Sequence, residues 1–585
     1  MLARRLRLCL LAATALVLLA SCSLTSEPEA PPHLEFSEPM LDLGTLREGQ
    51  IELRNTGGQA VGPVELLVSG VRDADGATVP GSHLMTAPQE IPTLNAGAAR
   101  TLTVSLSVQG SLIPGEYDAA ITARGGSQTS AQVAVRFVVL DYSDSAVVSV
   151  EILSTQTTAR VGDVVSLPLE ARNANGTVLQ GVPVSWSLEP SDAGHLGTSG
   201  QFVAYEAGNV TLVARAGVAS DTLRLDVNER GLTGSFNIVG RAQESERYTS
   251  DLWLHGTVAY AGTWGSRPVG TGINFGNTLN VWDIADPSSA QKVFSLEIDA
   301  RKVNDVKIRA DGTLAIITHE HSQDTLNGIT ILDLADPLAP TVLGRFTSEL
   351  ESGVHNVWID GDYAYVAVDG TGFGLRILDI SDPTSPRIVG RYWAGSSSLH
   401  DVYVRDGLAF LSHWNAGLVI LDVGYGIAGG TPEAPVEVSR LEELGGQTHN
   451  AWYWPEAGYV FVGEEDFGTP GLMHVVDVRN LREPRKVATY GVPGQPPHNF
   501  WLDEATGTLY VAWYAEGLRA LDVTGELLGE LDRQGREIAG LRYNGGSGFC
   551  NRPSQDTCAW APQLHNGLVW VSDMNEGLIA LEPVR

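Results

Sequence analysis

"GLRILDISDPTSPRIVGRYW" runs from Gly374 to Trp393 and contains two apolar stretches joined by a polar turn. Proline fixes the backbone at Asp382-Pro383, so this segment predicts two short strands around a tight corner. The pattern [LVW]-D-[ILV] recurs at intervals of 43 to 55 residues, at Asp283, Asp333, Asp379, Asp422, Asp477 and Asp522. A repeat of this length built from short strands predicts a β-propeller over residues 230–585.

The number of copies predicts seven blades of four strands each. The last copy, "LVWVSDMNEGLIALEPVR" (568–585), stops after its third strand. Its missing strand is present at the other end of the repeat region, because "SFNIVGRAQ" (235–243) matches "PRIVGRYWA" (386–394). We therefore expect the N-terminal strand to complete the last blade and close the ring, which removes exposed sheet edges.

The repeats also resemble a known family. "LVILDV" (418–423) and "HVVDV" (474–478) are similar to the LVIVD repeat of bacterial β-propeller proteins. The resemblance covers about 230–585 and implies a propeller fold and export from the cytoplasm. It implies no particular reaction.

Two modules of short alternating strands precede the repeats. Residues 33–141 contain "IELRNTGG" (51–58), which resembles bacterial Ig-like domains. Residues 143–228 contain "VGDVVSLPLEARNANGTVLQGVPVSWS" (161–187), which resembles the invasin-like Ig fold. The predicted fold class is therefore all-β, with two Ig-like β-sandwiches followed by the propeller. Neither module has a cluster of titratable groups, so we expect both to form a stalk.

The N-terminus has the features of a secretory signal over residues 1–21, with a basic start and an apolar stretch. Leu19-Ala20-Ser21-Cys22 resembles the lipobox of bacterial lipoproteins, which implies lipidation at Cys22 and a lipid bilayer as partner. Residues 22–32 then form a tether. Ser23 after the cysteine implies an exported protein on the outer membrane or cell surface.

Charge and cysteine content limit the partners further. The formal net charge of −31 repels nucleic acid and anionic lipid, so neither is expected to bind. Cys550 and Cys558 are expected to form a disulfide, because exported compartments are oxidising. We expect a monomer whose ligand is a protein, a glycan or a small molecule.

A polar pair precedes the first strand of four consecutive repeats: His355-Asn356, His400-Asp401, His449-Asn450 and His498-Asn499. In a propeller, the turn into the innermost strand opens on the same face as the turn after the second strand. Other candidate binding residues follow the second strands, and these are His413, Trp414, Glu464, Trp513 and Asp573, with Glu465 and Trp264 beside them. All of these side chains are expected at one axial mouth.

Three interpretations of the histidines remain open. Each histidine can donate a hydrogen bond to a carbonyl of the next blade and act structurally. The mouth can bind a polar ligand or peptide. His355, His400, His449 and His498 can instead converge on a transition metal such as Zn, Cu or Fe, as in a metal-dependent enzyme. No G-x-S-x-G motif or reactive cysteine is visible, so the sequence favours binding over catalysis, with a purely structural surface scaffold as a further alternative.

Overall fold

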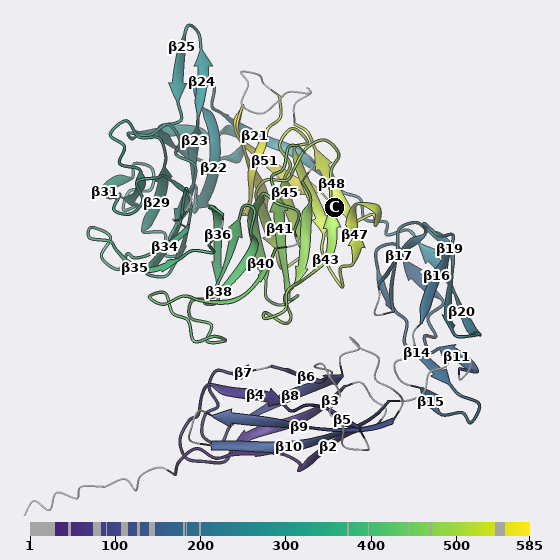
Figure 1. The fold of residues 1–585 in the computed structure, drawn as a ribbon. Helices are drawn as coiled ribbons and strands as arrows, with labels where there is room; N and C mark the ends of the chain where they lie inside the picture. The colour runs from purple at the N-terminus through teal and green to yellow at the C-terminus, as the bar shows by residue number, and fades with distance from the viewer. Residues whose placement is uncertain are drawn as a thin grey trace, which may run out of the picture. The chain divides into compact units, whose positions relative to one another are not determined.

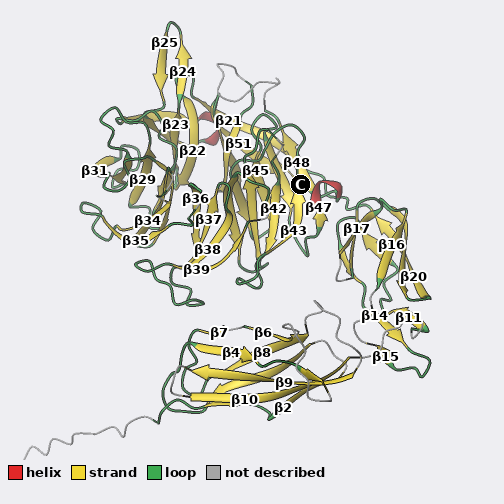
Figure 2. Cartoon of the chain, in the orientation of Figure 1, coloured by secondary structure: helices red, strands yellow, loops and turns green. Residues whose placement is uncertain are grey.

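The computed structural model describes residues 30–584, apart from 45–47, 74–83, 89, 107–114, 126–128, 140–146, 180–181, 183, 198–199, 371, 373, 396, 443, 469–470 and 544–555. The regular elements of this part are strands, with two short 3-10 helices, η2 (Pro287–Ser289) and η3 (Leu531–Arg533) (Figure 2). No described helix is long and apolar enough to cross a membrane. The signal peptide, Cys22 and Cys550 lie outside the described residues, so the lipid anchor and the disulfide stay predictions.

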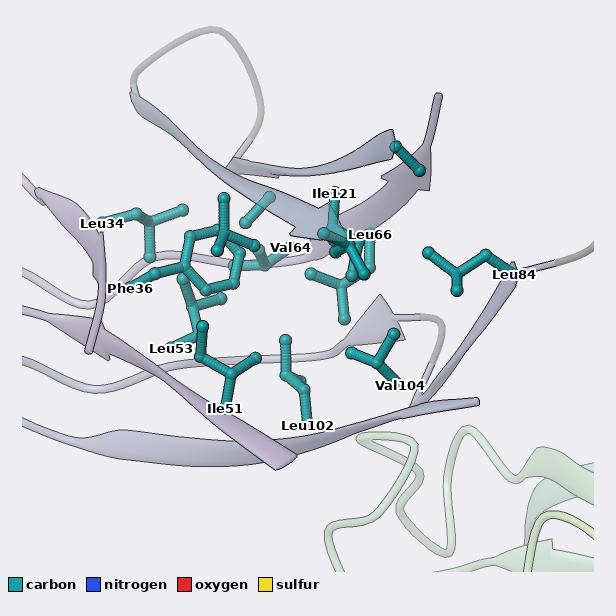
Figure 3. Close-up of a cluster of buried hydrophobic side chains, with 14 of the residues drawn as sticks. Leu34, Phe36, Ile51, Leu53, Val64, Leu66, Leu84, Leu102, Val104 and Ile121 are labelled. Atoms are coloured by element: carbon teal, nitrogen blue, oxygen red, sulfur yellow. The ribbon is translucent and has the colours of Figure 1, made fainter. Parts of the chain in front are cut away.

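The first compact unit ends at Asp141 and contains two sheets. One sheet has the order β1 (Leu34–Phe36), β3 (Glu48–Asn55), β8 (Ala99–Leu106), β6 (Leu84–Ala87). The other has the order β2 (Met40–Gly44), β10 (Thr129–Val139), β9 (Gly115–Gly125), β4 (Val64–Val68), β7 (Glu90–Ile91), with β5 (Arg72–Asp73) beside β9. Alternate residues are buried along β9, and the inward side chains of both sheets form one core (Figure 3).

The second compact unit begins with a module of three small sheets. Their orders are β11 (Ser149–Ile152), β14 (Leu169–Arg172), β15 (Val178–Leu179); β12 (Thr158–Arg160), β20 (Ala219–Asn228), β19 (Gly208–Ala216), β16 (Ser185–Glu189); and β13 (Val164–Ser166), β18 (Gln201–Ala204), β17 (Gly194–Gly197). The alternating pattern of β19 places Val210, Leu212 and Ala214 in the core of this module.

The rest of the second unit, which we call the head, contains seven sheets of four or five strands among the described residues (Figure 1). Most are antiparallel meanders in which consecutive strands are neighbours. The first four are β22 (Tyr248–His255), β23 (Val258–Trp264), β26 (Thr278–Asp283), β27 (Gln291–Glu297); β28 (Val306–Ile308), β29 (Leu314–His319), β30 (Gly328–Asp333), β31 (Thr341–Phe346); β32 (Val354–Asp360), β33 (Tyr363–Val368), β34 (Gly374–Asp379), β35 (Arg387–Tyr392); and β36 (Leu399–Arg405), β37 (Leu408–His413), β38 (Gly417–Asp422), β39 (Val436–Leu441). A hairpin of β24 (Ser266–Val269) and β25 (Gly272–Phe275) projects from the first of them (Figure 1).

The other three sheets complete the head. They are β40 (Thr448–Trp454), β41 (Tyr459–Glu464), β42 (Met473–Asp477), β43 (Arg485–Tyr490) with β47 (Gly529–Glu530); β44 (Phe500–Asp503), β45 (Thr508–Ala512), β46 (Leu518–Asp522), β48 (Glu537–Leu541); and β49 (Ala559–His565), β50 (Leu568–Asp573), β51 (Gly577–Val584), β21 (Ser235–Gln243). The middle strands are buried on both faces, as in β29, β37 and β41. Their nearly continuous apolar sequences reflect this two-sided burial.

The last sheet joins the two ends of the head. β21 pairs antiparallel with β51, from Ser235 opposite Val584 to Gln243 opposite Gly577. This is the pairing that the match between 235–243 and 386–394 predicts. The head is therefore a β-propeller-like fold in which the first and last segments share one sheet.

Candidate functional site

In three of the four polar pairs, those at His355, His400 and His449, both members face the centre of the head because the strand that carries them is bulged. In β32 the register shifts between Val354 and Asn356, so His355 is an extra residue relative to β33. The same shift occurs at His400, His449 and Trp560. On a regular strand consecutive side chains point to opposite faces, whereas a bulge redirects the extra one. His355 consequently lines one central cavity while Asn356 lines a second.

The four histidines and two tryptophans form a circle of rings around the first cavity. Successive ring centroids from His355 through His400, His449 and His498 to Trp560 lie 4.2, 4.5, 4.2 and 4.1 Å apart. Trp264, at the end of β23, completes the circle, 5.3 Å from Trp560 and 5.9 Å from His355. The structure thus brings together the four histidines that the sequence placed at one mouth.

Two of the histidines connect neighbouring sheets by hydrogen bonds. Nδ1 of His400 lies 3.2 Å from the carbonyl oxygen of His449, and Nδ1 of His498 lies 2.6 Å from that of Trp560. A carbonyl only accepts, so Nδ1 carries the proton and Nε2 keeps its lone pair. Asn304 occupies the equivalent position in its sheet and donates to the carbonyl of His355 at 2.8 Å. The contact that the structural interpretation requires is therefore present at His400 and His498.

The four imidazoles differ in charge. Burial opposes the charged form of His355, but the Glu320 carboxylate, 2.9 Å from Nδ1, outweighs this effect and raises its pKa to about 9. Burial lowers the pKa of His498 to about 3. Burial and neighbouring histidines also lower the pKa of His400 and His449 well below the usual value. Near neutral pH the circle contains one imidazolium and three neutral imidazoles.

The cavity inside the circle has a volume of about 290 Å³. Its lining residues are Trp264, His355, His400, His449, Glu465, Phe467, Gln495, His498, Tyr514 and Trp560. Glu465 accepts a hydrogen bond from the Tyr514 hydroxyl, and burial raises the pKa of the Glu465 carboxyl. Neutral imidazole nitrogens and a carboxylate make the polar wall rich in acceptors, while indole and phenyl rings form the apolar wall.

A second polar layer lies at the residues that follow the bulges. Lys307 contacts Asp251 at 2.9 Å and also pairs with Asp305. Asn356 donates to Asp305 at 2.9 Å and to Asp401 at 3.2 Å. These residues come from four different sheets, so the layer ties the sheets together across the axis. Burial raises the pKa of Asp401 to about 7.

A third layer consists of aromatic side chains that form a second circle of rings. Successive centroid distances around Trp253, Trp358, Tyr403, Trp452 and Trp501 are 5.9, 4.6, 5.0, 5.1 and 6.0 Å, the last returning to Trp253. The aromatic residue after each polar pair therefore packs against its equivalents from other sheets. These aromatic rings line the second cavity together with the polar layer.

The remaining predicted residues lie in different surroundings. Trp414 stacks on His400 with centroids 4.7 Å apart. Trp513 is fully buried and donates to the carbonyl of Gln495 at 2.7 Å. His413 is buried next to Tyr392, and Asp573 accepts backbone N–H bonds from Asn575 and Glu576. Glu464 lies 2.8 Å from Nε2 of His474.

Four residues that the sequence selected, Glu464, Glu465, Asn450 and Asn499, lie in or near the two cavities, and one that it did not select, Glu320, completes the site. Glu464 and Glu465 point apart, as expected for adjacent strand residues, and Glu465 is the one that lines the cavity. Glu320 follows the end of β29 and pairs with both His355 and Lys302. Glu320 directly follows a second strand, which is the position that supplied the other candidates. Its partners His355 and Lys302 lie in other segments, so the sequence did not show the pairing. Asn450 and Asn499 line the second cavity with Asn356 and Asp401.

Two groups of side chains in the described part have the composition of a metal site. Ligand atoms of His400, His449 and Glu465 lie within 4.8 Å of one another, and so do those of Glu320, His355 and Asp369. The four histidines predicted to share one metal are therefore divided, with His498 in neither group.

Residues 353–393 and 396–440 match the model of the LVIVD repeat. The chain carries LVIVD repeats. No curated protein matches it. Two solved structures resemble 59% of this chain, each at 10% identity: the computationally designed Ika8 protein, with a TM-score of 0.39 over 99% of its length, and the Cps50 (Swd1) beta-propeller domain of Myceliophteria thermophila, with a TM-score of 0.41 over 98%. Both TM-scores are low, so the propeller-like fold is assigned from the repeats and from the sheets themselves.

Proposed function

We propose that the protein is a lipid-anchored binding protein of the bacterial cell envelope. In this proposal the seven sheets are the blades of a closed propeller, the two N-terminal modules are Ig-like parts of a stalk, and Cys22 carries the anchor on the outer membrane or cell surface. The head binds a small polar ligand, or a polar group of a larger partner, in the cavity bordered by the histidines.

The observation that carries the proposal is the acceptor-rich cavity lined by the four histidines and Glu465. Hydrogen bonds between sheets account for Nδ1 of His400 and His498. Nε2 of each ring makes no hydrogen bond with a described residue. A purely structural scaffold would need only the polar layer around Lys307 and the layer of five aromatic rings, because these two layers already join the sheets. A concave pocket with a few convergent polar groups is the usual form of a ligand site.

Thermal unfolding of the purified chain with amines, polyols, carboxylates and short peptides tests the proposal. A bound ligand at about 100 times its Kd stabilises the folded state by about 2.7 kcal/mol. Phe467 is 59% exposed at the cavity edge, so Phe467→Ala should reduce this shift with little effect on folding. Trp393→Ala serves as the control, because Trp393 is 49% exposed and lies outside the cavity lining. Unchanged melting with every compound class would favour the scaffold alternative.

A further inference from the structure

Two histidines and one carboxylate meet at the wall of the cavity. His400 and His449 are the bulged residues of β36 and β40, and Glu465 follows the last residue of β41. One ligand atom from each lies within 4.8 Å of the others, and Nε2 of His449 is 3.8 Å from Oε2 of Glu465. We propose that these three side chains bind one divalent transition-metal ion, for which Zn²⁺ is the suitable probe. The inference rests on the proposed function. It adds that the cavity binds a metal ion, to which the ligand of the head would then bind.

The hydrogen bonds around the three side chains suit metal ligands. A metal-bound histidine usually donates its other N–H to a carbonyl or carboxylate, which fixes the tautomer and the ring orientation. Nδ1 of His400 makes this bond to the carbonyl of His449, so its Nε2 lone pair is available. Glu465 is oriented in the same way by the Tyr514 hydroxyl.

His449 gives an independent indication of a missing partner. Its side chain is 3% exposed and lines the cavity. Nδ1 is buried and makes no hydrogen bond of normal geometry with a described residue, although the Asn450 side chain lies close to the ring, and Nε2 is too far from Glu465 for a hydrogen bond. A buried polar group without a partner costs about 1–3 kcal/mol, so a ligand that contacts this imidazole would stabilise the folded protein.

Charge separates this group from the second cluster. In the other cluster, Glu320 already pairs with His355 through one oxygen and with Lys302 through the other, at 3.1 Å. These two cations occupy the place that a metal ion would take. Asp369 of that cluster therefore provides a matched control.

Three protein ligands leave a coordination position open. Structural zinc sites usually have four protein ligands, whereas sites that bind an exogenous molecule have three. Here the open position faces the cavity of about 290 Å³, which has room for water or a small donor ligand. The metal would thus be the anchoring point for the ligand of the head.

Zinc titration of the chelator-treated full chain, with competition against a chromophoric chelator, measures affinity and stoichiometry. One Zn²⁺ per chain is expected, and Glu465→Gln or His449→Gln should weaken binding at least about 10-fold. Asp369→Asn should leave the affinity unchanged. Substitution with Co²⁺ adds a visible spectrum that should shift in Tyr514→Phe, because the hydroxyl orients a ligand of the metal.

Binding of no Zn²⁺ by the wild-type chain overturns the inference without reference to any variant. Equal Zn²⁺ affinity in wild type and Glu465→Gln, with a loss in Asp369→Asn, also overturns it and assigns the metal to the other cluster. If the metal-free chain still shows a ligand-induced melting shift that Phe467→Ala reduces, the proposed function survives the loss of the metal. If the chain neither binds Zn²⁺ nor shows a ligand-induced melting shift, both the metal site and the proposed function are wrong.

Discussion

At the scale of single residues, the repeated aspartate has one task in all six copies of its motif. Asp283, Asp333, Asp379, Asp422, Asp477 and Asp522 end the third strand of their sheets, and each accepts the backbone N–H of the residue two positions later at 2.9–3.0 Å. A side chain that satisfies this N–H starts the turn toward the fourth strand. The motif is therefore a turn signal, which explains why it could be found in the sequence without knowledge of any ligand.

Asp379 allows a direct test of this role. Asp379→Ala should lower the free energy of unfolding by about 1 kcal/mol, because it removes the acceptor for Ser381. Asp379→Asn should cost less, since an amide oxygen still accepts that N–H and the Arg387 partner is largely exposed and contributes little. Urea unfolding at neutral pH measures both. Equal losses in the two variants would show that charge, not the turn bond, is important.

The same residue predicts a pH dependence. Hydrogen bonds from Ser381 and Arg387 lower the pKa of Asp379 from 3.8 to about 2. A lowered pKa means that the carboxylate stabilises the folded state above pH 3.8, and that this contribution is lost as the pH falls toward 2. The stability difference between wild type and Asp379→Asn should therefore shrink over this range. A difference that stays constant down to pH 2 would contradict the assignment.

At the scale of elements, the third strands of several sheets begin at a glycine that approaches a neighbouring strand. Gly417 opens β38 with φ at +79°, and a Cβ there would lie 2.0 Å from the carbonyl oxygen of Leu441 at the end of β39. The close approach lets β38 and β39 pair along their length. Glycine is needed here for both its backbone conformation and its lack of a side chain.

Gly417→Ala should therefore destabilise the head by about 2 kcal/mol or more, because the strained conformation and the contact with Leu441 add together. Gly344→Ala is the control, since a Cβ at Gly344 in β31 meets no atom within 4 Å. Its melting temperature should stay close to that of wild type. Similar losses in both variants would mean that only the flexibility of glycine matters.

At the scale of the whole molecule, the second module is fastened to the head within one compact unit. Arg230 is nearly inaccessible and pairs with Asp522 at the end of β46 and with Asp163 of the module at 3.0 Å. Arg536 donates to the carbonyl of Gly162 at 2.5 Å from the head side. A module held by buried charged contacts should unfold together with the head rather than as an independent domain.

Arg230→Met tests this attachment. Removing one member of a buried pair leaves Asp522 uncompensated, so the free energy of unfolding should fall by about 3 kcal/mol. Calorimetry should then show a separate, earlier transition for the module. Arg172→Met is the control, because its pair with Glu170 is partly exposed and should contribute less than about 1 kcal/mol. A single unshifted transition in Arg230→Met would exclude the coupling.

The proposed lipid anchor at Cys22 can be tested at the same scale. Cys22→Ser should abolish labelling by a fatty-acid analogue and move the protein from the membrane to the soluble fraction of bacterial cells. Several acyl chains give stable membrane attachment, whereas their loss leaves an acidic protein that anionic lipid repels. Membrane association that persists in Cys22→Ser would show that another part of the chain binds the envelope.

The sequence by itself determined the repeat length, the turn aspartates, the polar pair before four of the first strands and the match between 235–243 and 386–394, because each of these is a local or periodic signal. Only the tertiary structure decided how the pairs are divided between layers, since that depends on bulges at residues such as His355 and His400. It also decided that Glu320 pairs with His355 while Glu465 faces His449. Those partners come from neighbouring sheets or distant loops, and their contacts exist only when the sheets assemble around a common axis. The histidines and Glu465 were visible in the sequence, whereas Glu320, which makes His355 chemically unlike the other three histidines, was not.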